Sequence, residues 1–376
     1  MLIAVNTRFL LHDKMEGIGR FTYETLSRIT RSHPEHEFLF FFDRKHHPEF
    51  IFSKNVTAVE LFPPARHPFL FYWWFELSVT TTLKKYKPDV FLSTDGYLSL
   101  KTEVPSIAVI HDLAFLHYPE GIDFLGRKYY EYFFPRFAKK AKRIVAVSNF
   151  TKQDIIKQYG IDENKIDVVY NAPAKGFQPI DELKKTEIRN KFTGGAEYFF
   201  TSSAIHPRKN IDTLLKAFDQ FKQETKSPLK LVVTGRKAWQ TKNIEVAFNQ
   251  MQFKHDVIFT GRVSDEDLYN LTAAAFCMVY VPLFEGFGLP IVEAMACHVP
   301  VITSNVSSMP EVSGNAAILV NPLAVEEVAN AMIKISSDEN MRMNLIEESM
   351  KRKSFFDWDK SAEDLWNTII KTVNVK

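Results

Sequence analysis

The chain has 376 residues, and its 47 Lys and Arg residues nearly balance its 45 Asp and Glu residues, which leaves a formal net charge of +2. A chain of this length is too long for one ordinary hydrophobic core, so two α/β domains are expected. The balanced charge argues against a dedicated nucleic-acid binder, and the ordinary composition argues against a disordered chain.

The N-terminal residues MLIAVNTRF indicate a first strand and not a signal peptide, because polar residues follow Val5. The two cysteines, Cys277 and Cys297, lie in apolar stretches and are predicted to be buried free thiols. The most aromatic stretch, residues 69–77, is far too short to span a membrane. We therefore expect a cytoplasmic protein.

Short apolar runs rich in Val, Ile and Phe predict strands, and amphipathic segments of helical length separate them. The runs are residues 2–6, 38–42, 89–92, 107–110 and 143–147, then 198–201, 229–234, 257–259, 276–281 and 299–303. A helix is expected over residues 211–221 with Asn210 as its cap, and another after a capping box at Ser264. This alternation predicts an α/β fold class with doubly wound parallel sheets.

A segment with two prolines, a glycine and mixed charge, NAPAKGFQPIDELKK, follows the strand-like residues 166–170 and predicts a domain boundary near residues 172–193. Sheets of this type bind ligands at the carboxyl ends of their strands. If the two sheets face each other, one ligand can lie in the cleft between them.

The strongest local signal is EGFGLPIVE, residues 285–293, which follows the predicted strand 276–281. Gly286 and Gly288 permit a close backbone approach, and Pro290 suits the first turn of a helix. The segment therefore predicts a strand, a glycine loop and a helix N-terminus whose N–H groups suit a phosphate.

Glu285 and Glu293 could be the acid and base of a hydrolase, but eight helical residues span roughly 12 Å. Paired glycosidase carboxyls are about 5–9.5 Å apart. The two glutamates better suit the opposite ends of an elongated ligand such as a nucleotide sugar. Equally, Glu285 can be an ordinary loop residue and Glu293 an ordinary charge on a helix surface, without a role in ligand binding.

Other polar residues also follow predicted strands. Arg208 and Lys209 can stabilise the charge of a departing diphosphate, or they form a solvated basic turn. His111 can donate to a sugar hydroxyl, or it forms a capping pair with Asp112.

Several motifs in this order resemble the family-4 glycosyltransferases of GT-B fold over most of the chain. They are EGIGRFTYE, VIHDLAFLHYPE, VAVSNFTKQDI, HPRKNIDTLLKAF, FTGRVSDEDLYNL and EGFGLPIVEAMACHVPVITSNVSSMPEVSG. The resemblance implies two Rossmann-like domains facing across a cleft, over residues 1–175 and 176–355, with a C-terminal helix over 356–376 that returns to the first. It also implies a retaining, metal-independent hexosyltransferase without a cofactor, which uses a nucleotide-diphosphate sugar and a saccharide or lipid-linked acceptor.

Carried over by position, Glu285 matches the glutamate that contacts the donor sugar, and Glu293 matches the one that binds the ribose. His111 matches a residue near the reacting carbon. The loop that holds sugar and diphosphate corresponds to Gly286, Phe287, Gly288 and Leu289.

The GxG of Gly17 and Gly19, between the first strand and a helix expected near Phe21, is weak alone because the third glycine of a dinucleotide fingerprint is missing. In the family this loop approaches the donor phosphates. Arg236 and Arg262, which follow strands of the second half, are candidates for base recognition, or they are surface charges.

The chain departs from the family at two places. His298 stands where many members have glycine at a helix end. Ser203 and Ala204 replace an arginine, so diphosphate neutralisation depends more heavily on Arg208 and Lys209.

GDP-mannose is the leading donor candidate. The alternatives are a nucleotide-sugar epimerase or hydrolase of the same fold and a non-catalytic nucleotide-sugar-binding protein. The motif Asp357-Trp-Asp359 is interpreted as a helix start and not as a metal site. The basic and aromatic stretch 127–143, in which Pro135 is expected to interrupt any long helix, could dock at the inner face of an anionic membrane or pack its aromatic residues inward.

Overall fold

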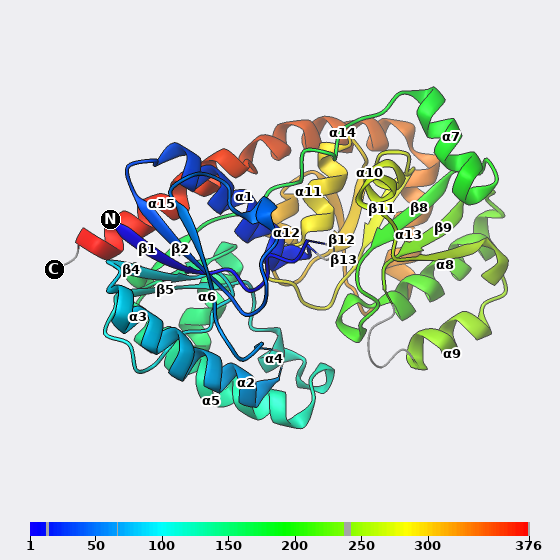
Figure 1. Cartoon of the computed structure of the whole chain (residues 1–376). Coiled ribbons are helices and arrows are strands. Elements are labelled where there is room, and N and C mark those ends of the chain that lie inside the picture. Colours follow the sequence, from blue (N-terminus) through cyan, green and yellow to red (C-terminus); the bar gives the residue numbers. More distant parts are fainter. Residues whose placement is uncertain (13–14, 66, 237–241, 375–376) are drawn as a thin grey trace. The chain divides into compact units, whose positions relative to one another are not determined.

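The structure is a computed structural model that describes residues 1–12, 15–65, 67–236 and 242–374. Its internal contacts divide the chain into two units. The first unit comprises Met1–Asn171 together with Asp357–Lys376, and the second comprises Ala172–Phe356. Each unit has one β-sheet with helices packed on it (Figure 1).

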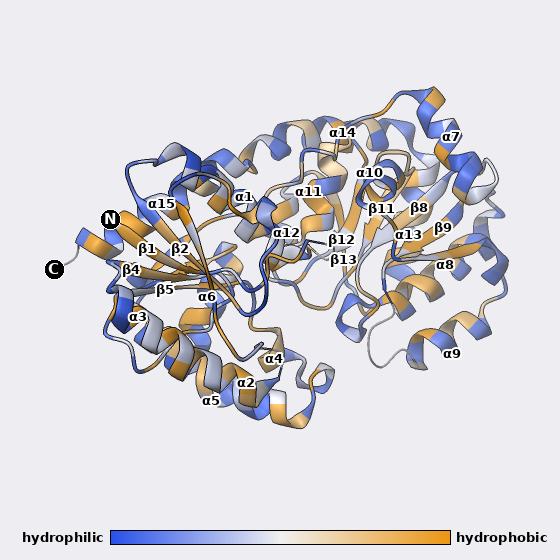
Figure 2. Cartoon of the chain, viewed as in Figure 1, coloured by the Kyte–Doolittle hydropathy of each residue, from blue (hydrophilic) through white to orange (hydrophobic). Residues whose placement is uncertain are grey.

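The first unit contains a seven-stranded parallel sheet in the order β3-β2-β1-β4-β5-β6-β7. The strands are β1 (Leu2–Asn6), β2 (Glu37–Phe42), β3 (Val56–Glu60), β4 (Val90–Ser93), β5 (Ser106–Ile110), β6 (Arg143–Ala146) and β7 (Ile166–Val168). All five apolar runs predicted in this half form strands, and the central strands are buried on both faces, as their continuous apolar sequence requires. Figure 2 shows these strands in hydrophobic colours.

Helices cover both faces of this sheet (Figure 1). They are α1 (Gly17–Ser32), α2 (Pro68–Trp73), α3 (Thr80–Tyr86), α4 (Ala114–His117), α5 (Phe124–Lys140), α6 (Asn149–Tyr159) and α15 (Trp358–Asn374), and the π-helical turn Trp74–Val79 joins α2 to α3. No described helix is both long and apolar enough to cross a membrane.

The C-terminal helix α15 packs against α1 and belongs to the first unit. Asp357 caps it, because its Oδ1 accepts from the backbone N–H groups of Asp359 at 2.6 Å and Lys360 at 3.1 Å. The Asp359 carboxylate in turn accepts from Arg28 Nε of α1. The interpretation of Asp357-Trp-Asp359 as a helix start is therefore confirmed.

The expectation that Pro135 interrupts the helix is wrong, because α5 runs through it. One face of α5 buries Tyr129, Phe134 and Phe137 in the core. This burial favours the helix although proline cannot donate to the preceding turn. Arg136 adds a donor to that turn, since its Nη1 lies 2.5 Å from the carbonyl oxygen of Tyr132.

The second unit contains a six-stranded parallel sheet in the order β10-β9-β8-β11-β12-β13. Counted within the unit this is 3-2-1-4-5-6, the order of the dinucleotide-binding sheet. The strands are β8 (Tyr198–Ser202), β9 (Lys230–Thr234), β10 (Val257–Gly261), β11 (Cys277–Tyr280), β12 (Val301–Ser304) and β13 (Ala317–Val320). The five runs predicted in this half also form strands.

The helices of this unit are α7 (Glu182–Thr193), α8 (Ile211–Thr225), α9 (Lys242–Gln250), α10 (Asp265–Ala273), α11 (Leu289–Ala296), α12 (Met309–Ser313), α13 (Val325–Ser337) and α14 (Glu339–Arg352). Ser264 caps α10 as predicted, by accepting from the Asp267 N–H at 3.1 Å. Both cysteines are buried and free, also as predicted.

Two turns of the second unit differ in detail from the expectation. Asn210 does not cap α8 with its side chain, because its Nδ2 donates to the carbonyl oxygens of Val281 at 3.0 Å and Pro322 at 2.6 Å. His298 adopts φ 58°, a left-handed conformation that favours glycine. The turn after α11 therefore keeps the geometry of a glycine cap without the glycine.

Candidate active site

The strand order of the second sheet reverses between β8 and β11, and a ligand crevice is expected at the carboxyl ends of these two strands. Arg208 and Lys209 follow β8 in the 3₁₀ turn Pro207–Lys209, and Glu285 follows β11. Three of the predicted site residues are therefore brought to one place by the topology of the sheet.

Both cations bind one carboxylate oxygen. Arg208 Nη1 donates to Glu285 Oε1 at 2.7 Å and to the Phe284 carbonyl oxygen at 3.1 Å. Lys209 Nζ donates to the same Oε1 and to the Tyr280 hydroxyl at 3.0 Å. Two positively charged side chains therefore converge on one carboxylate oxygen, and a diphosphate bound here would meet both cations.

The cluster is largely shielded from solvent, since the Lys209 and Glu285 side chains are 13% and 12% exposed. Burial alone raises the pKa of Glu285, but the charges of Arg208 and Lys209 more than offset it, so the pKa is lowered from its ordinary value. Glu285 therefore stays ionised at neutral pH. Burial, reinforced by the Glu285 charge, raises the pKa of Tyr280, which stays a neutral hydroxyl.

The glycine loop needs glycine at Gly288, which immediately precedes α11. Its φ is 102°, and a Cβ there would lie 2.7 Å from Met309 Cε. The hydroxyl of Ser308 donates to the carbonyl oxygens of Glu285 at 2.8 Å and Phe287 at 2.9 Å. Side chains from the segment before α12 thus fix the loop that leads into the N-terminus of α11.

Glu293 is partly buried on α11. Burial is the main cause of the raised pKa of Tyr280, and the charges of Glu285 and Glu293 both add to it. The two glutamates of the motif therefore act electrostatically on the same hydroxyl.

Arg236 and Arg262 are exposed and follow β9 and β10. Their turns lie side by side, because the Gly235 N–H donates to the Gly261 carbonyl oxygen at 3.0 Å. The strand order places Arg262, Arg236, the Arg208–Lys209 turn and then Glu285 in succession along one edge of the sheet. A row of this kind suits an extended ligand.

In the first unit, His111 follows β5 and its Nε2 lies 2.8 Å from the Thr94 carbonyl oxygen. A carbonyl oxygen only accepts, so Nε2 carries the hydrogen and Nδ1 is the acceptor nitrogen of the neutral ring. Burial lowers the pKa of His111, which favours this neutral form. The neighbouring Asp112 accepts from the Ala114 N–H at 3.0 Å, as expected of a capping residue.

A buried polar network at the carboxyl ends of β1 and β4 was not predicted. Asn6 Nδ2 donates to Asp95 Oδ1 at 2.9 Å, and the Arg8 guanidinium binds Asp95 Oδ2 and lies 4.3 Å from the centre of the Tyr97 ring. The network surrounds the turn whose Thr94 carbonyl holds His111. Polar residues directly after two strands that flank the reversal of strand order were the signal for it.

Gly17 and Gly19 were expected in a loop that precedes a helix beginning near Phe21. In the structure they lie in the first turn of that helix, because α1 already begins at Gly17. Gly19 is buried, and a Cβ there would lie 2.6 Å from the Phe9 carbonyl oxygen. Close packing on the preceding loop therefore explains this glycine without a ligand.

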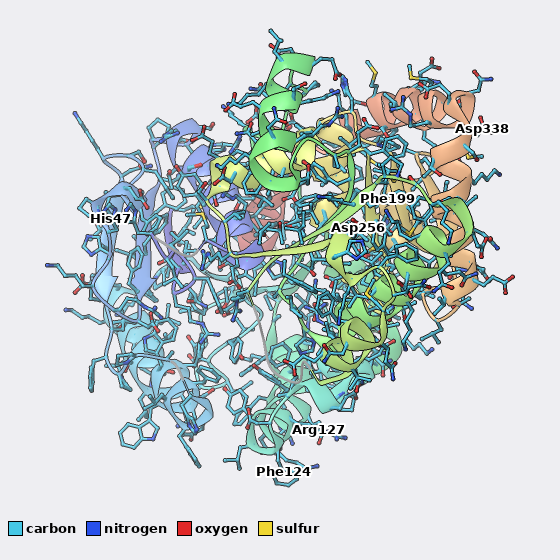
Figure 3. The ribbon with its side chains drawn as sticks, turned by 90° about the vertical axis from the view of Figure 1, so that its right-hand side faces the viewer. His47, Phe124, Arg127, Phe199, Asp256 and Asp338 are labelled. Atoms are coloured by element: carbon cyan, nitrogen blue, oxygen red, sulfur yellow. The ribbon has the colours of Figure 1, made fainter. Side chains whose placement is uncertain are left out.

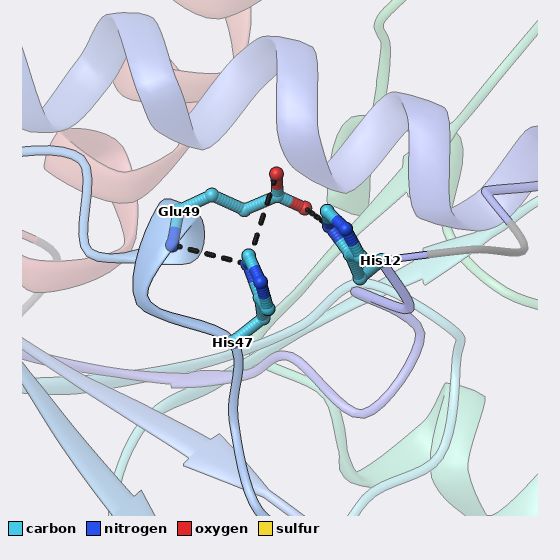
Figure 4. A group of neighbouring side chains, drawn as sticks. All are labelled: His12, His47 and Glu49. Carbon is cyan, nitrogen blue, oxygen red and sulfur yellow. Dashed lines mark hydrogen bonds and ion pairs between the residues drawn. The ribbon is translucent and has the colours of Figure 1, made fainter.

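His12, His47 and Glu49 form an exposed surface group whose potential ligand atoms lie within 4.8 Å of one another (Figure 4). His12 Nδ1 lies 2.6 Å from Glu49 Oε1, and the two imidazole rings stack at 3.8 Å with planes 16° apart. Lone pairs in nearly parallel, stacked planes do not converge on one point. The group is therefore not preformed for a metal ion.

The comparisons with known proteins agree with this architecture. The family model "Glycosyltransferase Family 4" matches residues 15–172, and the model "Glycosyl transferases group 1" matches residues 184–352. Two doubly wound sheets matched in this order define a glycosyltransferase of GT-B fold. The chain belongs to the family-4, group 1 glycosyltransferases.

The chain is 29% identical to O-antigen chain mannosyltransferase B of Escherichia coli over 289 aligned residues. The aligned region covers 76% of this chain and 75% of that protein. This chain is 32% identical to O-antigen chain mannosyltransferase RfbU of Salmonella typhimurium over 213 aligned residues. That aligned region covers 57% of this chain and 56% of the relative. HepE from Anabaena, solved in complex with UDP and glucose, superposes with a TM-score of 0.74 at 16% identity over 98% of this chain and 99% of that one.

Proposed function

We propose that this glycosyltransferase transfers mannose from GDP-mannose to a hydroxyl of a saccharide, with retention at the anomeric carbon and without a metal ion. The observation that carries the proposal is the pairing of Arg208 and Lys209 with Glu285 at the reversal of strand order. The names of the two mannosyltransferase relatives support mannose as the sugar.

In the proposed reaction the bond between C1 of the sugar and the phosphate oxygen breaks, and the acceptor oxygen bonds to C1 on the same face. The proton of the acceptor hydroxyl passes to the departing phosphate oxygen. Arg208 and Lys209 stabilise the charge that develops on the diphosphate, which is the task a metal ion performs in other enzymes. Glu285 is paired with both cations and hydrogen-bonds to sugar hydroxyls without forming a covalent intermediate.

The remaining predicted residues take roles along the same ligand. The backbone of residues 286–289 holds sugar and diphosphate, Glu293 accepts from the ribose hydroxyls, and Arg236 and Arg262 contact the base. In the first unit, neutral His111 contacts the sugar near C1. The acceptor is a saccharide of the O-antigen type, carried on a lipid, and the protein attaches peripherally to the cytoplasmic face of the membrane.

The test is a panel of GDP- and UDP-sugars in a thermal-shift assay, because a ligand that binds only the folded state raises the melting temperature. GDP-mannose is expected to give the largest shift and, with a mannose-terminated oligosaccharide, a new glycoside whose anomeric configuration by NMR equals that of the donor. The proposal fails if the product is inverted, or if the chelator EDTA abolishes transfer. Rapid loss of donor without acceptor indicates the hydrolase or epimerase instead, and binding without turnover indicates a sensor.

A further inference from the structure

The last turn of α14 contacts the short helix α12, which lies against the glycine loop of residues 285–288. α14 packs on α11 within the second unit (Figure 1), and Figure 3 shows Asp338 at its first end. At the other end, Arg352 donates from Nη2 to the Glu311 carbonyl oxygen and from Nε to the Val312 carbonyl oxygen at 3.1 Å. The last carbonyl oxygens of a helix have no donor within it, so Arg352 satisfies two of them for α12.

The other end of α12 contacts the glycine loop directly. Ser308 immediately precedes α12, and its hydroxyl donates to the carbonyl oxygens of Glu285 at 2.8 Å and Phe287 at 2.9 Å. Met309, the first residue of α12, is fully buried, and its Cε fills the space where a Cβ of Gly288 would lie. A displacement of α12 would therefore displace the loop.

A second path from Arg352 to the loop passes through a pair of aromatic rings. The Arg352 guanidinium lies 5.2 Å from the centre of the Phe356 ring. Phe356 meets Phe287 of the loop edge to face, with ring centres 5.6 Å apart and planes at 85°. The two residues are 5% and 4% exposed, so this contact is buried. Arg352 thus reaches the loop both through α12 and through Phe356.

The residue after Arg352 fixes the other end of α11. Lys353 Nζ lies 3.0 Å from Nε2 of His298, which forms the left-handed turn after α11. An ammonium only donates, so this nitrogen accepts and the His298 ring is neutral. In agreement, burial and the charge of Lys353 lower the pKa of His298. Residues 352–353 therefore support α11 at its end as well as the loop before it.

We propose that Arg352 is a positioning residue for sugar transfer, because it holds α12 and Phe356 where they keep the glycine loop in its ligand-binding form. The proposal rests on the proposed function, in which the backbone of this loop holds the sugar and the diphosphate. Backbone N–H groups stabilise an anion best when they already point at it, so a loop that must first be ordered binds more weakly and reacts more slowly. The Arg352 guanidinium is engaged by two carbonyl oxygens and two aromatic rings, so it acts on the protein and not on the ligand.

The first experiment measures amide hydrogen exchange in the full chain without a ligand. In Arg352→Gln, peptides that cover residues 284–289 and 307–314 should exchange at least about tenfold faster than in the unmodified protein, because the hydrogen bonds that oppose local opening are lost. Peptides of β9 should exchange as before. Arg352→Lys keeps the charge but cannot donate to both carbonyl oxygens in the same geometry, so its exchange should be intermediate.

The second experiment compares the binding of GDP and GMP by calorimetry, because only GDP carries the second phosphate that the loop is proposed to hold. Arg352→Gln should bind GDP about tenfold more weakly, and its kcat with GDP-mannose should fall by up to about 100-fold. Its affinity for GMP should change much less. A merely structural loss would weaken the binding of both nucleotides alike.

Arg342→Gln is the matched control. Arg342 stands on the same helix, pairs with a carboxylate at 2.5 Å and lies 5.3 Å from the centre of the Phe276 ring, but its partner Glu339 belongs to α14 itself. Exchange in the loop and GDP affinity should therefore stay as in the unmodified protein. Thermal melting shows whether each variant is folded, and should Arg352→Gln not fold, Arg352→Lys carries the same exchange test.

A double-mutant cycle tests whether Arg352 acts through α12. Ser308→Ala removes the hydroxyl that joins α12 to the loop. Because the two side chains lie on one path, the double variant Ser308→Ala/Arg352→Gln should lose less GDP affinity than the product of the two single losses.

Three results overturn the proposal. They are unchanged exchange at residues 284–289 in Arg352→Gln, exchange that rises equally throughout the second unit, and losses in the cycle that multiply. Full recovery of GDP binding by Arg352→Lys while the loop still exchanges fast would show that the charge acts on the ligand, and the proposal would be wrong. If the unmodified protein binds no nucleoside diphosphate, the proposed function fails, whereas the exchange experiment needs no ligand and still decides whether Arg352 holds the loop.

Discussion

Replacing Lys209 by methionine tests the cation cluster most directly. Methionine keeps the length and apolar stem of the side chain but removes the ammonium that donates to Glu285 and to the Tyr280 hydroxyl. Glu285 retains its bond to Arg208, so the carboxylate stays paired and the fold should persist.

The size of the effect follows from what the ammonium contributes. One charge-assisted hydrogen bond in a shielded site is worth about 1.5–3 kcal/mol, so GDP or GDP-mannose should bind about 10- to 150-fold more weakly to Lys209→Met. Because the charge on the diphosphate grows as the sugar leaves, kcat should fall further, by about 10²- to 10³-fold. Lys209→Arg, which keeps the charge, should recover part of both losses.

Calorimetric titration with GDP and initial rates with GDP-mannose measure the two effects. Lys222→Met is the matched control, since Lys222 is also a shielded lysine, 5% exposed and 2.7 Å from its partner Asp256, but lies outside the cluster. It should lose stability without losing donor affinity. If Lys209→Met binds GDP as tightly as the unmodified protein and turns over at a similar rate, the assignment of the diphosphate site is refuted.

Three further predictions concern pH and backbone. The pKa of Glu285 in the folded protein lies below its ordinary value of 4.5, so the ionised carboxylate stabilises the fold fully above pH 4.5. This stabilisation should be lost as the pH falls through the folded pKa. Urea unfolding at descending pH should show the loss, and the variant Glu285→Gln should not show it. The pKa of His111 is lowered from 6.5, so the unfolded chain takes up the proton first and stability should rise with pH up to about 6.5; an NMR titration of the His111 ring with a midpoint above 6.5 would contradict the buried neutral form. Gly288→Ala should destabilise the protein by about 1–3 kcal/mol through backbone strain, and by more through the clash of the new methyl group with Met309. In the control Gly160→Ala, where φ is 64° and no atom lies within 4 Å, only the strain should lower the stability. Equal melting temperatures for the two variants would show that the loop before α11 adapts.

Two strands escaped prediction, β3 and β13, and both are edge strands, whereas the other two edge strands, β7 and β10, were predicted. β3 and β13 each pair with a single neighbour. The sequence of β3, VTAVE, is mixed, with Thr57 exposed, because only part of an edge strand meets the core. β13 is a four-residue apolar run, AILV, that was not predicted although its composition suits a strand, and its Leu319 is exposed. At Pro135 the sequence contains a local signal against a helix, and the packing of α5 on the core outweighs that signal.

The candidate site divides in the same way. Glu285, Arg208 and Lys209 could be predicted because each directly follows a recognisable strand and the strand order brings them together. Asp95 also follows a predicted strand, but its partners Asn6 and Arg8 lie almost ninety residues earlier in the chain, and only the pairing of β1 with β4 makes them neighbours. The donor-binding role of Gly19 stays a prediction, and the close approach of the Phe9 carbonyl oxygen is a separate reason for a glycine at this position.

The first unit is assembled from two stretches of chain, and this affects how it can be made. A ribosome releases residues 1–171 long before α15, so the nascent first unit lacks the helix on which α1 rests. Fully buried residues of α15 such as Leu365 and Ile369 find their partners only after the whole second unit has been synthesised. Removing the last twenty residues should therefore leave the second unit able to fold while the first unit, though nearly complete in sequence, exposes part of its core and becomes prone to aggregation.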